Sequence, residues 1–63
     1  MSQKPKCKLV GQDGNVFNLI GLASRTLKDS GLSEQVKEMT EKCFNSHSYD
    51  EALSVITQYV DVY

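Results

Sequence analysis

The chain has 63 residues, a formal net charge of −1 and 40% apolar residues. A chain this short folds as a single domain with a thin core and little room for an enclosed active site. Its near-neutral charge gives no field that favours nucleic acid or a membrane surface. No apolar run reaches membrane-spanning length or is typical of a signal peptide, so we expect a cytoplasmic protein.

The N-terminus predicts a short strand after a disordered start. Residues 1–5 are mostly polar and end at Pro5, and we expect them to be disordered. Residues 6–10 alternate briefly and then become apolar, which is typical of a strand. The backbone of a strand needs a partner. The candidates are the alternating segment 60–63 and the same strand of a second copy, and either would make this strand a site of assembly.

Residues 11–21 connect the strand to the first predicted helix. This segment suits an Asp-Gly hairpin turn, a phosphate-binding loop or a strand-to-helix connector. We favour the connector, because the apolar residues that follow keep helical spacing for longer than a hairpin arm extends. Gly11 and Gly14 would then adopt positive φ, and Asn15 would cap the helix. A calcium loop opening at Asp13 lacks its closing glutamate.

Three helices are predicted after the connector. Apolar residues at three- and four-residue spacing place them at about residues 15–30, 33–44 and 48–60. Their inner faces comprise Val16, Leu19, Ile20, Ala23, Leu27, Leu32, Val36, Met39, Cys43, Phe44, Tyr49, Ala52, Leu53, Ile56 and Val60. The predicted fold is therefore mostly α, with a short N-terminal β-strand followed by a three-helix bundle and a C-terminal segment that can pair with the strand.

Glycines and polar residues mark the helix ends. Gly31 predicts a left-handed C-terminal cap on the first helix, and Ser33 predicts the N-cap of the second. Ser48 and Glu51 predict a capping box, in which each side chain bonds to the other residue's backbone amide. Gly21, inside the first helix, costs about 1 kcal/mol relative to alanine, which indicates that another backbone packs closely there.

Cys43 and His47 are the only pair that suggests chemistry. A zinc site would need Cys7 and a fourth ligand, but the chain has two cysteines and one histidine. A nucleophile pair would need both groups exposed, whereas Cys43 falls on the apolar face of its helix. We therefore expect free thiols, no cofactor, no metal and no catalysis.

A nucleic-acid role has two supports in the sequence. Lys4, Lys6 and Lys8 form a basic arm, and the Gly31 turn between two helices is compatible with a helix-turn-helix motif. The helix that would read the bases, residues 33–44, carries more acidic than basic side chains, so phosphates would repel it. We do not favour nucleic-acid binding.

Protein binding fits the sequence best. The chain is small, its strand needs a partner, and tyrosines offer rigid surfaces with polar tips. We expect a non-enzymatic interaction module that forms a homo-oligomer, and the tyrosines could alternatively rim the core of a single chain. The candidate interface residues are Lys6, Lys8, Tyr49, Tyr59, Val62 and Tyr63.

The segment 9–21 has the pattern Leu9-x-Gly11-x-Asp13-Gly14-Asn15-x-Phe17-x-Leu19-Ile20-Gly21. This pattern, continued through Leu27, Gly31, Ser46 and Tyr49-Asp50, resembles short uncharacterised proteins of bacteriophages, prophages and mobile elements, although His47 replaces an expected glycine. The resemblance implies a bacterial host and a host or phage protein as partner, but no activity. In that setting, sequestration of a nucleotide at a dimer seam built from Lys6, Lys8 or Arg25 is the alternative function.

Overall fold

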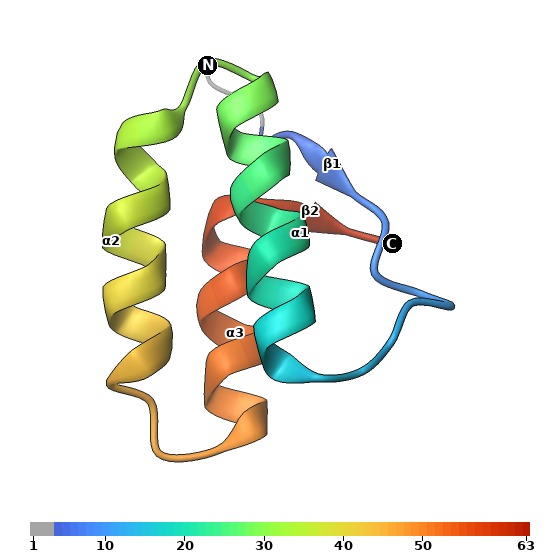
Figure 1. Cartoon of the computed structure of the whole chain (residues 1–63), viewed down its shortest axis with the longest axis vertical. Helices are drawn as coiled ribbons and strands as arrows, with labels where there is room; N and C mark the ends of the chain where they lie inside the picture. Colours follow the sequence, from blue (N-terminus) through green and yellow to red (C-terminus); the bar gives the residue numbers. More distant parts are fainter. Residues whose placement is uncertain (1–3) are drawn as a thin grey trace.

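The computed structural model describes residues 4–63, and its elements follow the predicted order. They are β1 (Lys6–Cys7), α1 (Val16–Asp29), α2 (Ser33–Phe44), α3 (Tyr49–Tyr59) and β2 (Asp61–Val62). The helices pack side by side, and the strands lie on the side of α1 and α3 away from α2 (Figure 1). The predicted class, mostly α with a short N-terminal strand and a three-helix bundle, is confirmed. None of the described helices is long and apolar enough to cross a bilayer.

The C-terminal segment is the partner of the N-terminal strand. β1 and β2 pair in parallel, in the register Lys6–Asp61 and Cys7–Val62. The N–H of Asp61 donates to the carbonyl of Pro5 at 2.8 Å, and the carbonyl of Tyr63 accepts from Leu9 and Val10 at 2.8 and 3.0 Å. The chain therefore supplies its own strand partner, and the choice that the sequence left open is resolved within one copy.

This pairing corrects two predictions about the N-terminus. Residues 4 and 5 are ordered, because Lys4 Nζ donates to the carbonyl of Thr57 at 2.8 Å and Pro5 takes part in the pairing; residues 1–3 lie outside the described residues. The strand is also shorter than predicted and ends at Cys7. The pairing satisfies one edge of β1, and the other edge of this two-stranded sheet has no strand beside it within residues 4–63.

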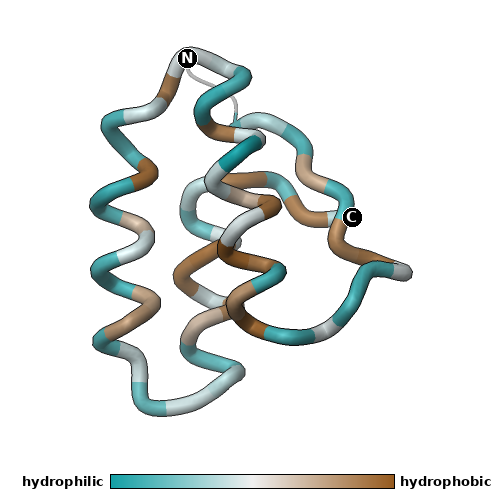
Figure 2. The backbone as a smooth tube through the Cα atoms, in the orientation of Figure 1, coloured by the Kyte–Doolittle hydropathy of each residue, from teal (hydrophilic) through white to brown (hydrophobic). Residues whose placement is uncertain are grey.

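Each helix buries one face in the core between the helices and the strands. The buried apolar residues are Cys7, Leu9, Leu19, Ile20, Ala23, Leu27, Met39, Cys43, Ala52, Ile56, Tyr59 and Val60. Figure 2 shows the apolar stretches of α1 and α3 beside each other within the bundle. The predicted inner faces are wrong at Phe44 and Tyr49, which are 62% and 46% exposed, whereas Tyr59, a candidate interface residue, is buried.

The connector before α1 has the predicted role. Gly11 adopts a φ of +83°, in the left-handed region, but Gly14 does not have a positive φ, so that part of the prediction is wrong. Asn15 Oδ1 accepts from the N–H of Phe17 at 2.9 Å and caps the helix. The Asp13 carboxylate accepts from the N–H of Asn15 at 3.1 Å, which holds the cap in position.

The end of α1 is closed by a Schellman motif. Gly31 has a φ of +76°, as predicted. Its N–H donates to the carbonyl of Lys28 at 3.1 Å, and the N–H of Leu32 donates to the carbonyl of Leu27 at 2.8 Å. These two hydrogen bonds satisfy two carbonyls of the last helical turn. The prediction of Ser33 as N-cap is wrong: Leu32 occupies that position without a side-chain hydrogen bond, and Ser33 is the first helical residue.

Two further local predictions are corrected. Ser48 Oγ accepts from the N–H of Glu51 at 3.1 Å, as the capping box requires, but the Glu51 carboxylate accepts from the N–H of His47 at 2.9 Å rather than from Ser48. A Cβ at Gly21 would have no neighbour within 4 Å. No other backbone of the described chain therefore packs closely against Gly21.

Candidate interaction surface

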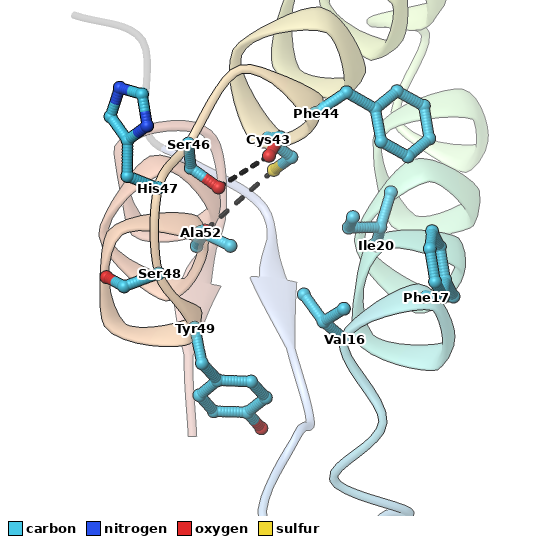
Figure 3. A pocket seen from close by; sticks show the side chains of 10 residues that line it. All are labelled: Val16, Phe17, Ile20, Cys43, Phe44, Ser46, His47, Ser48, Tyr49 and Ala52. Atoms are coloured by element: carbon cyan, nitrogen blue, oxygen red, sulfur yellow. Dashed lines mark hydrogen bonds between the residues drawn. The ribbon is translucent and has the colours of Figure 1, made fainter.

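An open hollow lies where the start of α1, the end of α2 and the start of α3 meet (Figure 3). Its volume is about 360 Å³. Phe17, Phe44 and Tyr49 surround it, and Ile20 and Ala52, both buried, contribute to its lining. An apolar depression with a few polar groups at its margin is typical of a binding site.

Phe17 and Phe44 lie next to each other at the boundary of α1 and α2. Their ring centroids are 6.1 Å apart and the ring planes are tilted by 46°, within the range of favourable aromatic pairs. The two residues are nevertheless 67% and 62% exposed. Covering such apolar surface is worth about 25 cal/mol per Å². The pair is thus held in place within the chain while most of its surface stays available.

Tyr49 fixes the third side of the hollow. Its hydroxyl donates to the carbonyl of Gly14 at 2.6 Å, which ties the first residue of α3 to the connector before α1. The side chain remains 46% exposed. Tyr49 therefore has a defined orientation and presents apolar ring surface to solvent, as aromatic residues at interfaces do.

A second hollow shares Tyr49 with the first. Its volume is about 240 Å³, and its lining comprises Leu9, Val10, Gly14, Leu19, Tyr49, Leu53 and Val62. Val10 is 68% exposed. The apolar surface that begins at the two phenylalanines thus continues past Tyr49 toward the strands.

The surroundings of Cys43 and His47 do not favour chemistry. Cys43 Sγ lies 3.8 Å from the carbonyl of Ala52, and burial raises the pKa of the thiol, which disfavours the reactive thiolate. The imidazole of His47 is exposed and points away from Cys43 in Figure 3. Cys7 and Cys43 are both free and buried. Within residues 4–63, no three His, Cys, Asp or Glu residues gather as metal ligands would.

The structure separates the interface residues predicted from sequence. Tyr49 and Val62 share the second hollow, whereas Lys6 and Tyr63 line another depression beside β2. Tyr59 is 8% exposed, and its hydroxyl is buried with no hydrogen-bond partner in the part of the chain described.

The basic residues suggested for a nucleotide seam are also spread over different elements. Lys6 and Lys8 are exposed in and just after β1, and Arg25 is exposed on α1.

Sequence reasoning missed the aromatic pair. Phe17 was given no role, and Phe44 was assigned to the inner face of α2. One signal was present: successive helical residues are rotated by about 100°, so Phe44 cannot share the direction of the neighbouring Cys43. No family model, curated protein or solved structure matches this chain.

Proposed function

We propose that this chain is a non-enzymatic interaction module that binds another protein through the surface formed by Phe17, Phe44 and Tyr49, called here the aromatic surface. The observation that carries the proposal is the exposure of two adjacent phenylalanines, 67% and 62%, beside an apolar hollow. Single exposed apolar residues are common, but a contiguous patch of this kind marks an interaction site.

The geometry of the aromatic surface favours binding. The ring pair and the Tyr49 hydrogen bond hold the side chains before a partner arrives, so little rotamer entropy is lost on binding. An apolar side chain of the partner can enter the hollow between the rings and displace water from them. Interface hot spots have this form, an anchor residue in a pocket surrounded by aromatic groups.

The polar groups near the surface support binding rather than catalysis. The nucleophile candidate, Cys43, is buried and its pKa is raised by burial. The resemblance of the 9–21 segment suggests a phage or mobile-element setting, in which the partner would be a host or element protein. Homo-oligomerisation is the simplest form of such binding.

Site-specific photocrosslinking tests the proposal. A photoreactive phenylalanine analogue replaces Phe17 in cells that contain the protein, and we expect a discrete adduct with a protein. The same analogue at Tyr63, which is 57% exposed and lines a different depression, is the matched control and should give little of that adduct. Phe44→Ser should reduce the Phe17 adduct at least about tenfold, a loss expected when an interface anchor is truncated.

No adduct from Phe17, or equal adducts from Phe17 and Tyr63, would contradict the proposal. Retention of the Phe17 adduct in Phe44→Ser would show that the two rings do not act as one surface. The mass of the adduct also identifies the partner class, because an adduct of two chains differs from one with a different protein.

A further inference from the structure

We infer that the partner of the aromatic surface is a second copy of this chain, with the two α1 helices crossing antiparallel at Gly21. This inference rests on the proposed function and names its partner. It starts from Gly21, Phe17 and the charged residues that share their face of α1.

Gly21 has no structural role within one chain. It lies inside α1, is exposed and does not have a positive φ. A Cβ there would meet nothing within 4 Å. An alanine would fit and would favour the helix. A glycine on an exposed helix face does permit close approach of another backbone, because the distance between helix axes depends on the side chains at the contact.

Gly21 belongs to a continuous stripe on the outside of α1. Phe17, Gly21, Arg25 and Lys28 are separated by four, four and three residues, the spacings that align side chains on one helical face. All of them are exposed, and Phe17 joins the stripe to Phe44. The stripe is therefore an unpartnered helix face that extends the aromatic surface.

The stripe is complementary to itself in the antiparallel direction. In a two-fold pair centred on Gly21, residues equally far on either side of it face each other. Phe17 then lies opposite Arg25 of the second copy, and this contact occurs twice. A guanidinium group over an aromatic ring is a favourable pair.

Parallel pairing does not give this complementarity. It would place Arg25 against Arg25 and Lys28 against Lys28, and like charges repel each other. In the antiparallel arrangement, by contrast, each Phe17 lies opposite an Arg25 of the other copy. The face thus fits a second copy without requiring any other protein.

Sedimentation equilibrium of the intact chain tests the inference. Wild-type protein should have the mass of two chains at micromolar concentration and dissociate on dilution. Gly21→Ala should weaken the association at least about tenfold, because the methyl group separates the backbones at the crossing, and should raise the melting temperature of the dissociated chain. Ser54→Ala, at an exposed position of α3 away from the stripe, is the matched control and should leave association unchanged.

Arg25→Glu provides a second variant, at an exposed position of α1. It should also weaken association, because it places a carboxylate over the face of Phe17. A single-chain mass for the wild type would overturn the inference. So would association that survives both Gly21→Ala and Arg25→Glu.

The photocrosslink separates this inference from the proposed function. If the wild type is a single chain and Phe17 forms an adduct with another protein, the second-copy inference fails and the proposed function stands. If the wild type is a single chain and Phe17 forms no adduct, both fail.

Discussion

Tyr49 shows how one side chain joins distant parts of the chain. Its hydroxyl donates to the carbonyl of Gly14, 35 positions earlier. A Cβ at Gly14 would lie 3.6 Å from that hydroxyl, an ordinary contact distance. Gly14 thus contributes a backbone carbonyl to this contact, and its φ is not positive. Sequence spacing cannot predict this contact, because it depends on how α3 packs against the connector.

Tyr49→Phe should lower the free energy of unfolding by about 1 kcal/mol, since it removes one hydrogen bond and leaves the ring in place. Urea denaturation of the variant measures this loss. Tyr63→Phe is the control, because it removes a hydroxyl from a tyrosine that is 57% exposed, and its unfolding midpoint should stay near that of the wild type. Equal midpoints for wild type and Tyr49→Phe would argue against a structural role of the hydroxyl.

At the scale of the elements, local signals predicted most helix ends. Asn15, Gly31 and Ser48 occupy the predicted capping positions, because each acts through backbone groups only a few residues away. The prediction of Ser33 as N-cap was wrong because the helix starts one residue earlier, after the turn at Gly31. The carbonyl of Leu32 already accepts from the N–H of Gln35 at 2.9 Å. A cap signal therefore predicts a helix start only when the preceding turn leaves room for it.

The two serines provide a matched test of capping. Ser48→Ala should lower the free energy of unfolding by about 1 kcal/mol, because it removes the acceptor for the N–H of Glu51. Ser33→Ala should be neutral or slightly stabilising, because alanine has the higher helix propensity and no cap bond is lost. Thermal unfolding followed by circular dichroism compares them, and an equal loss in both variants would contradict the assignment of Leu32 as N-cap.

At the scale of the whole molecule, the sequence predicted the class of fold but not where its exposed aromatic residues gather. Helical spacing identifies the residues that are buried in each helix, so the three helices and most of the core were predicted. The alternation of polar and apolar residues predicted that both terminal segments are extended. It could not decide whether they pair within one chain or between two copies. After β1 and β2 pair with each other, the outer face of α1, including Phe17, remains exposed.

From the sequence alone, the interface was predicted at the tyrosines and the C-terminal segment. Nothing in the sequence indicated that other residues would bury them. In the folded chain, Tyr59 is in the core and Val62 is half-buried, whereas Phe17 and Phe44 are exposed. Their exposure depends on where α1 and α2 meet, which no single helix determines. An exposed aromatic pair of this kind becomes visible only when the helices are assembled.

In the proposed assembly, the outer face of α1, rather than the edge of β1, contacts a second copy. Amide resonances recorded over a dilution series test it most directly. We predict that dilution moves the resonances of Phe17, Gly21 and Arg25 together, while those of Lys6 and Lys8 stay in place. Resonances that do not change on dilution, or changes confined to the strands, would contradict the account.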